Sequence, residues 1–482
     1  MILVVDVGTS SVRAALVRDD ATVAHEERRP LLPASPAPGL VEFDATAMAA
    51  TVLELAGAAL AATGTEDVDA VGIANQRGST VVWDRATGEP VGPGIGWQDL
   101  RTVGRCLELK SAGLRTGPNY SATKLEHLLD IADPDRGRDL CFGTVDSWVA
   151  WTLTQGAVHV TDATNALITG MLDPDAHEWS DTALEILRVP PRLLPKVVDS
   201  SGIVGDASAL PGAPPIAGIA GDQQASLLGQ GCVHTGDAKI TFGTGGMLDL
   251  VLDARPEFEM QGPAGTFPIV CRRVGGTDTW GVEAVMLSAG TNVEWLRDDL
   301  GVITTAAESH DVAAGCESTG DVWYVPALLG LGTPAWDFGA RGTVLGLTRG
   351  TGRSELVRAV LEGVAHRAVD LVEAAEADSG IAVPHLRADG GMTDNPTFVQ
   401  LLADASRRTV EVSPVREATA LGAAFLAGLA TGAWDSEDDL AGTWAPRQRV
   451  EPRPGHELDR DRWRDACRRA ERWIPELSAV DF

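Results

Sequence analysis

The feature that most constrains the fold is a strand–turn–strand pattern that occurs twice, with its central threonines 235 positions apart. The apolar run 2–5 leads into Gly8-Thr9-Ser10-Ser11, and a return strand follows. In the second half, the run 239–242 leads into Gly243-Thr244-Gly245-Gly246 in the same way. Glycine and hydroxyl residues between short apolar runs are typical of hairpin turns. The repetition predicts two related α/β domains, each opening with a β-meander.

Helix and linker signals divide the chain. Asp44 is placed to cap a helix that runs to residue 62, and Ser354 to cap a second one that ends before Gly380. The glycine-rich segment 229–237 is the candidate linker. We therefore expect a first domain over 1–232, a second over 233–434 and a helical tail over 435–482.

Charge and lysine content exclude several function classes. The 39 basic and 68 acidic side chains give a formal net charge of −29, which argues against nucleic acid and anionic membrane surfaces as partners. The chain has four lysines, at positions 110, 124, 196 and 239, and none lies in a glycine-rich Gly-Lys-Ser/Thr loop. A P-loop is therefore excluded as the means of binding nucleotide.

The cysteines and the N-terminus favour a cytoplasmic protein. The six cysteines form no CxxC pair and indicate reduced thiols rather than a disulfide framework. The N-terminus has no basic segment followed by a signal-length apolar run. The sequence has no run of about 18 uninterrupted apolar residues, so no membrane span is expected.

The two turns carry the parts that phosphoryl transfer needs. Backbone N–H groups, the hydroxyls of the first turn and Arg13 can bind phosphate oxygens, and Asp6 can hold Mg²⁺ through water. Each turn alone is also compatible with an ordinary hairpin. Two such turns facing each other across a cleft would form an ATP site, and Gly391, before the helix that begins near Asn395, would let a ligand approach the backbone.

A second group of residues is suited to an alcohol substrate. Asp222 lies between a glycine and two glutamines, a setting suited to a rigidly held general base. The same position is also compatible with the N-cap of a helix. Arg77 and Trp97 could grip hydroxyl groups, or be a surface ion-pair arginine and a core tryptophan. Tyr120 is one of two tyrosines and is either a substrate contact or a structural residue.

Together these segments resemble the FGGY family of carbohydrate kinases, within the actin-like ATPase fold. The likeness runs from Val5 to about Trp434, is closest to the glycerol kinases, and includes Gly218–Gln224 and the stretch from Gly342 to Glu362. It implies two ribonuclease H-like α/β domains flanking a catalytic cleft. It also implies ATP and Mg²⁺ as cofactors, a small polyol or sugar as substrate, and a homodimer or homotetramer.

The resemblance also implies roles for individual residues. The catalytic base would be Asp222, and Asp6 and Asp222 would form the metal site. The substrate positions would be Arg77, Gly78, Trp97, Tyr120, Asp222, Gln223 and Met247. The nucleotide positions would be Thr9, Ser10, Ser11, Arg13, Thr244, Gly290, Glu294, Gly391 and Asn395.

Departures from the pattern bear on the substrate. Gly78 stands where glycerol kinases carry glutamate, Met247 where they carry phenylalanine, and Glu294 where a glutamine is expected. Losing a charged hydrogen-bond acceptor typically costs about 1.5–3 kcal/mol, and the first two changes are expected to enlarge or soften the site. Phosphorylation of glycerol is the first expectation. One alternative is a kinase for a larger polyol or a ketopentose such as xylulose. The other is a regulator that binds nucleotide without catalysis.

Overall fold

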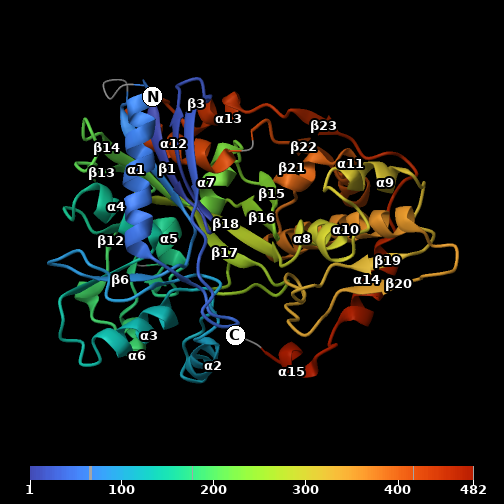
Figure 1. The fold of residues 1–482 in the computed structure, drawn as a ribbon, viewed down its shortest axis with the longest axis horizontal. Helices are drawn as coiled ribbons and strands as arrows, with labels where there is room; N and C mark the ends of the chain where they lie inside the picture. Colours follow the sequence, from blue (N-terminus) through green and yellow to red (C-terminus); the bar gives the residue numbers. More distant parts are fainter. Residues whose placement is uncertain (64–67, 176, 416, 481–482) are drawn as a thin grey trace.

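The computed structural model describes residues 1–63, 68–175, 177–415 and 417–480. Its centre is a thirteen-stranded sheet that runs through both halves of the chain (Figure 1). The strands of the first half are, in spatial order, β3 (Val23–Pro30), β2 (Ser11–Val17), β1 (Ile2–Val7), β5 (Ala70–Asn75), β14 (Pro215–Gly221) and β13 (Ser201–Asp206). Those of the second half are β17 (Phe267–Val274), β18 (Thr277–Met286), β16 (Gly246–Val251), β15 (Ala238–Phe242), β21 (His385–Asp389), β22 (Thr409–Val412) and β23 (Gln448–Val450).

The two halves repeat one spatial order of strands, although the second half has an additional strand, β17, between β16 and β18 in the chain. β1 pairs antiparallel with β2, β2 antiparallel with β3, and β1, β5 and β14 run parallel. β15 pairs antiparallel with β16, β16 antiparallel with β18, and β15, β21 and β22 run parallel. The halves are joined in the sheet at Ser201 and Val274, where β13 meets β17. The predicted meander is present in the first half as β1, β2 and β3. In the second half β15 and β16 form the predicted hairpin, but the prediction of a three-stranded meander is wrong there, because β16 pairs with β18 and β17 lies on the far side of β18.

Two helices lie between the halves and connect them. Helix α12 (Ala418–Thr431) packs on β1, β5 and β14 of the first half and also on α7 (Asp222–Gly229). Helix α7 in turn packs on β16 and β17 of the second half. The crossing is very close, because a β-carbon at Gly422 would overlap the carbonyl oxygen of Ala225. The chain thus places α12, a late element, in the core of the first half.

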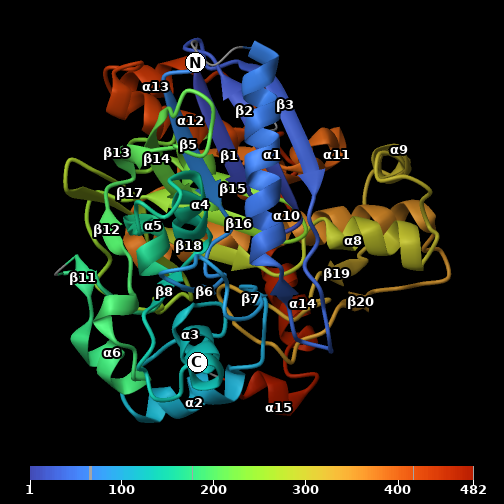
Figure 2. The same ribbon diagram turned by 60° about the vertical axis from the view of Figure 1, so that its left-hand side comes forward.

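The opposite face of the first half is covered by α1 (Ala45–Thr63) and α4 (Val145–Leu153) (Figure 2). As predicted, Asp44 caps α1, because its Oδ1 accepts a hydrogen bond of 2.9 Å from the backbone N–H of Ala47. Helix α1 is long and apolar enough to cross a membrane by length and composition alone. Here its apolar side chains, including Met48, Val52 and Leu60, lie in the core shared with β1 and β2.

The central helix of the second half is α10 (Arg353–Ser379), which ends at the left-handed Gly380 (φ 71°) as predicted. The predicted cap at Ser354 is wrong. The N-cap is Gly352, whose backbone N–H donates to the Glu355 carboxylate at 2.9 Å. The side chain that caps the N-terminus of α10 is therefore that of Glu355, which lies within the helix.

The segment after Trp434 is only partly the expected helical tail. It contains α13 (Glu437–Thr443), α14 (Arg460–Ala470) and α15 (Pro475–Ser478), but also β23, which pairs with β22 at the edge of the sheet. Trp463 of α14 is buried and its ring stacks on His366 of α10 at 4.8 Å. Strand β23 and helix α14 are therefore built into the second half, whereas Leu440 of α13 lies in the core of the first half.

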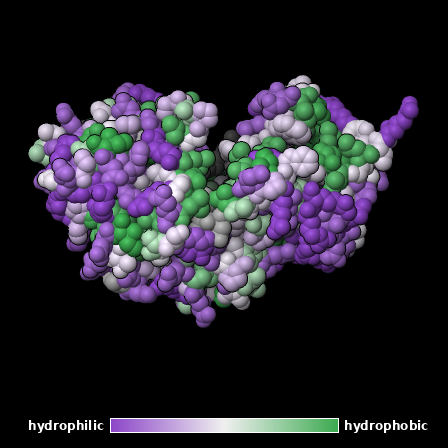
Figure 3. Space-filling model, turned by 90° about the horizontal axis from the view of Figure 1, so that it is seen from below, coloured by the Kyte–Doolittle hydropathy of each residue, from purple (hydrophilic) through white to green (hydrophobic). Residues whose placement is uncertain are grey.

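Smaller elements complete the structure. The short strands are β4 (Glu42–Phe43), β6 (Val81–Asp84), β7 (Gly94–Ile95), β8 (Leu140–Gly143), β9 (Val160–Asp162), β10 (Leu172–Asp173), β11 (Glu178–Trp179), β12 (Lys196–Val198), β19 (Trp323–Val325) and β20 (Thr343–Leu345). The remaining helical segments are α2 (Val103–Ser111), α3 (Ala122–Ala132), α5 (Ala163–Leu167), α6 (Asp181–Leu187), η2 (Pro191–Leu193), α8 (Thr291–Glu294), η3 (Trp295–Asp299), α9 (Glu308–Ala314), η4 (Gly391–Asp394) and α11 (Pro396–Ser406). Seen from below, the surface is cut by a deep notch between two lobes (Figure 3).

Candidate active site

Asp222 lies where β14 ends and α7 begins. The N-cap of α7 is Gly221, so Asp222 is the first helical residue and not the cap. Its Oδ1 accepts a hydrogen bond of 2.8 Å from the backbone N–H of Gln223. Burial raises the pKa of the Asp222 carboxyl, with Arg77 acting in the opposite direction. A raised pKa makes this carboxylate a better proton acceptor.

Arg77 joins Asp222 to a carboxylate of the other lobe. Its Nε lies 3.7 Å from Oδ1 of Asp222, and its Nη2 donates at 2.6 Å to Oε2 of Glu283, on β18. The arginine side chain is only 10% exposed, so it is not a surface ion-pair residue. Burial raises the pKa of Glu283 to about 7 although Arg77 lowers it. The predicted substrate arginine thus bridges the two halves.

Trp97 and Tyr120 lie beside this cluster. Trp97 Nε1 donates at 3.0 Å to the hydroxyl of Thr9, which connects the substrate positions with the first turn. Burial, reinforced by the charge of Glu283, raises the pKa of Tyr120 to about 12. The buried Lys124 donates to the carbonyl oxygens of Tyr120 (3.1 Å) and Trp97 (3.4 Å) and so holds both segments in place.

The second half of the central sheet contributes polar side chains that face α7. Lys239 and Asp249 are opposite each other on β15 and β16, are fully buried and form an ion pair of 2.8 Å. Lys239 Nζ also donates at 2.6 Å to Oε1 of Gln223. Because side chains two residues apart share a face of a strand, Met247 lies on the same face as Asp249. Gln223 and Met247, both predicted substrate positions, thus lie on facing elements.

Gly78 does not enlarge the site as expected. The residue has a φ of 70°, a conformation that favours glycine, and a β-carbon there would collide with the carbonyl oxygen of Asn119. The backbone of Asn119 therefore occupies the space on that side of Gly78.

The first turn brings several groups around Arg13. The turn is closed by a hydrogen bond of 3.0 Å from Gly8 N–H to the carbonyl of Ser11, and Ser10 at its tip is exposed. Arg13 forms an ion pair with Glu417 at the start of α12 and lies 4.0 Å from Asp6, its partner across the hairpin. Burial raises the pKa of Asp6 to about 6, Arg13 opposes this, and repulsion by Asp222 adds to it. Asp6 and Asp222 are therefore close enough for their charges to interact.

The second turn is tied to the start of α8. The carbonyl of Thr244 accepts a hydrogen bond of 2.8 Å from Ala289 N–H, and Gly290 N–H donates to the carbonyl of Gly243 at 2.8 Å. A β-carbon at Gly290 would lie 2.6 Å from that carbonyl oxygen, so only glycine fits there. Thr244 and Glu294, at the two ends of this segment, are both exposed. The structure thus brings these three predicted nucleotide positions together.

Gly391 and Asn395 flank the short segment between β21 and α11. Gly391 is exposed, and a β-carbon there would have no neighbour within 4 Å. Asn395 is buried and caps α11: its Oδ1 accepts from Phe398 N–H at 3.0 Å, and its Nδ2 donates to the Ser309 hydroxyl at 2.9 Å. Both polar groups of the Asn395 side chain are thus engaged within the protein.

The residues present fit a Mg²⁺ site of the kind that is completed by substrate. Among the described residues there is no group of three or more His, Cys, Asp or Glu side chains that could hold a metal ion alone. Mg²⁺ bound with phosphates usually takes only one or two carboxylates and keeps several waters. Asp6 and Asp222, whose repulsion raises the pKa of Asp6, offer two.

Three functional candidates escaped the sequence reasoning: Lys239, Glu283 and Glu417. The first two are charged residues inside apolar strands, AKITF and TDTWGVEAVM. A charged side chain within a buried strand needs a partner, and that pattern could have drawn attention to both. Glu417 lies in a loop before α12, and no local pattern connects it with Arg13.

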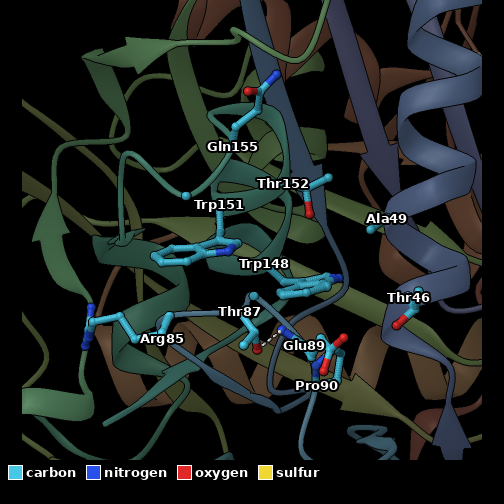
Figure 4. A pocket seen from close by; sticks show the side chains of 13 residues that line it. Thr46, Ala49, Arg85, Thr87, Glu89, Pro90, Trp148, Trp151, Thr152 and Gln155 are labelled. Carbon is cyan, nitrogen blue, oxygen red and sulfur yellow. Dashed lines mark hydrogen bonds between the residues drawn. The ribbon is translucent and has the colours of Figure 1, made fainter.

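A cavity of about 440 Å³ lies elsewhere, on the first half between α1, α4 and the turn after β6 (Figure 4). Trp148 and Trp151 line it, and the Trp148 Nε1 donates to the carbonyl of Ala45 at 2.8 Å. None of the predicted site residues borders this cavity. The candidate site is therefore the charged cluster between the lobes and not this cavity.

Comparison with known proteins gives a consistent result. The model of the FGGY family of carbohydrate kinases, N-terminal domain, matches residues 1–229, and that of the C-terminal domain matches residues 238–431. A glycerol kinase from Trichlorobacter lovleyi is 41% identical over 497 aligned residues, which cover 98% of this chain and 99% of that protein. The crystal structure of Plasmodium falciparum glycerol kinase with ADP has a TM-score of 0.89 and 28% identity over 98% of each chain. A xylulose kinase from Lactobacillus acidophilus has a TM-score of 0.86 at 19% identity, over 100% of this chain and 98% of that one, and shares the fold.

Proposed function

The chain belongs to the FGGY family of carbohydrate kinases, and we propose that it transfers the γ-phosphoryl group of ATP to a primary hydroxyl of glycerol. Membership confirms the two-domain α/β kinase fold expected from the sequence. The observation that carries the proposal is the cluster of Asp222, Arg77 and Glu283 between the two lobes. Glycerol is favoured over xylulose as the acceptor because relatives named glycerol kinases are about 40% identical to this chain over nearly its whole length.

In the proposed reaction, Asp222 is the general base. It accepts the proton of the attacking hydroxyl, whose oxygen forms a bond to the γ-phosphorus while the bond to the β-phosphate oxygen breaks and ADP leaves. The raised pKa of Asp222 favours this proton transfer. The walls of the acceptor site would be Arg77, Gly78, Trp97, Tyr120, Gln223 and Met247.

The two turns would hold the phosphates. Thr9, Ser10 and Ser11 would bind from the first lobe, with Arg13 turning from Glu417 toward the phosphate charge. The second-lobe nucleotide positions would be Thr244, Gly290, Glu294, Gly391 and Asn395. Asp6 and Asp222 would hold Mg²⁺. When bound, this ion supplies positive charge that offsets the negative charge of the transferring phosphoryl group. Closure of the lobes would exclude water.

We propose that the enzyme works in the cytoplasm and that it forms a homodimer or homotetramer. All six cysteines are free thiols, as expected for a reducing compartment.

The test is ADP release from ATP and Mg²⁺ with glycerol, erythritol, xylitol and xylulose. We expect glycerol to give the highest kcat/KM. Asp222→Asn should lower kcat for the best acceptor by on the order of 10²–10⁴, the usual contribution of a general base, while ATP still binds. Asp135→Asn, in an exposed loop, is the control and should leave kcat unchanged. The proposal would be contradicted if the enzyme phosphorylated none of the four acceptors, or if Asp222→Asn retained full turnover.

A further inference from the structure

We infer that Glu283 is a substrate-binding residue, whose carboxylate accepts a hydrogen bond from a hydroxyl of the acceptor that is not phosphorylated. The inference rests on the proposed function and adds a residue that determines specificity for the acceptor. It also places a substrate contact on the second lobe, whereas the base and Arg77 lie on the first.

The position of Glu283 supports this role. Its side chain is 9% exposed and projects from an otherwise apolar part of β18, between Val282 and Ala284. Oε2 accepts the 2.6 Å hydrogen bond from Arg77, whose Nε lies 3.7 Å from Asp222. Within the described residues, no hydrogen bond to Oε1 of Glu283 is present. One carboxylate oxygen therefore remains for a ligand, one guanidinium away from the proposed base.

Oε1 of Glu283 is not among the fully buried side-chain oxygens that lack a partner, so a ligand that enters from solvent can reach it. A carboxylate removed from water is stable only when it is paired and hydrogen-bonded, and burial raises the pKa of Glu283 to about 7 despite Arg77. A substrate hydroxyl can donate the hydrogen bond that Oε1 lacks. The acceptor would thus complete the hydrogen bonding that the protein leaves open.

The charges around the acceptor define its class. The buried cluster holds two cations, Arg77 and Lys239, and four carboxylates, Asp222, Asp249, Glu283 and Asp389. An acceptor with a carboxylate or phosphate of its own would meet excess negative charge here. A neutral polyol would instead donate hydroxyl protons to the carboxylates, so the cluster favours glycerol over a sugar acid.

Gly78 cannot provide a side chain that binds the acceptor, whereas Glu283 can. The glycine directly follows Arg77, but a β-carbon at this position would collide with the carbonyl oxygen of Asn119. No side chain can therefore reach the acceptor from position 78. Glu283 approaches Arg77 from the opposite lobe and supplies a carboxylate beside it.

The experiment compares Glu283→Gln with wild type on glycerol, 1,2-propanediol and 1,3-propanediol, each of the diols lacking one hydroxyl of glycerol. Loss of the charged acceptor should raise KM for glycerol about 10- to 100-fold, the usual effect of one such hydrogen bond, with KM for ATP unchanged. On the diol that lacks the contacted hydroxyl, the same variant should lose less than about threefold. A purely structural role would reduce activity on all three acceptors alike.

Glu411→Gln is the matched control. Glu411 is 8% exposed and lies on β22 of the same sheet, and its partners Arg449 and Arg387 are not part of the candidate site. It should leave KM for glycerol unchanged. If Glu283→Gln does not fold, Glu283→Asp, which keeps the charge but withdraws the oxygens by one methylene, is measured in the same way.

The outcomes are distinguishable. Wild-type turnover of glycerol with equal KM values for wild type and Glu283→Gln, or an equal loss on glycerol and both diols, overturns the role of Glu283 and leaves the proposed function standing. Faster wild-type turnover of gluconate than of glycerol overturns the acceptor class. Absence of turnover with every polyol refutes the proposed function and the inference with it.

Discussion

Replacing Asp6 by asparagine should stabilise the metal-free protein while removing its activity. Asp6 is 13% exposed, and burial together with repulsion by Asp222 raises its pKa from 3.8 to about 6, against the effect of Arg13. At pH 7.5 the carboxylate is ionised in both the folded and the unfolded chain, but its charge is less favourable in the folded chain. At about 1.4 kcal/mol per pKa unit, the ionised Asp6 costs about 3 kcal/mol of folding free energy.

The sign follows from proton binding. Between about pH 4 and pH 6 the folded chain holds the Asp6 proton and the unfolded chain does not, so the free energy of unfolding falls as the pH rises through this window. The advantage of Asp6→Asn should therefore be complete above pH 6 and vanish below pH 4. With about 2.1 cal/mol/K of unfolding entropy per residue over 482 residues, about 3 kcal/mol corresponds to a Tm increase of about 3 °C.

The assay is thermal unfolding in EDTA from pH 4 to pH 8, with Asp135→Asn as the exposed-loop control. Adding Mg²⁺ and ATP should raise the Tm of wild type more than that of Asp6→Asn, because the variant lacks a proposed metal ligand. Glycerol-dependent ADP release should be lost in the variant. A lower Tm for Asp6→Asn at pH 7.5, or a Tm difference that is the same at pH 4 and pH 8, would refute the reasoning.

Two further predictions concern the elements that carry the site. Lys239→Met should lower the free energy of unfolding by about 3–5 kcal/mol, because it leaves Asp249 buried without its partner. In urea unfolding, the double variant Lys239→Met/Asp249→Leu should recover most of this loss. A double variant no more stable than the single one would contradict the prediction. Gly422→Ala should lower the urea midpoint clearly, since α7 and α12 would be forced apart. Gly57→Ala, in α1 with no neighbour within 4 Å of the added carbon, should instead stabilise by about 0.5–1 kcal/mol, and equal behaviour of the two would show that the helix crossing is not tight.

Local patterns predicted the parts of the fold that local physics determines. The two glycine-containing turns, the cap at Asp44 and the stop at Gly380 each depend on residues adjacent in sequence. The cap at Ser354 was wrong because a glutamate inside the helix reaches back to the N-cap backbone. Strand β23 was missed because it has three residues, two of them exposed, and exists only through its pairing with β22.

The site was predictable only in part, for the same reason. Asp222 and Arg77 stand in motifs that can be read along the chain, and the structure brings them together at 3.7 Å. Glu283 lies 206 positions from Arg77, and their hydrogen bond is created by the approach of the two lobes. Whether a buried charge becomes a ligand contact or a structural pair thus depends on tertiary packing.

The position of α12 has a consequence for the order in which this protein can be made. Ile2 and Val4 lie on β1, which is synthesised long before α12, and in the finished molecule they belong to a core that includes the apolar residues of α12, Trp434 and Leu440. At about 5–20 residues synthesised per second, that face of β1 waits about 20–90 s for its cover. The first lobe therefore completes its core only after α12 has been synthesised, and until then the nascent chain exposes an apolar sheet face that a chaperone could shield.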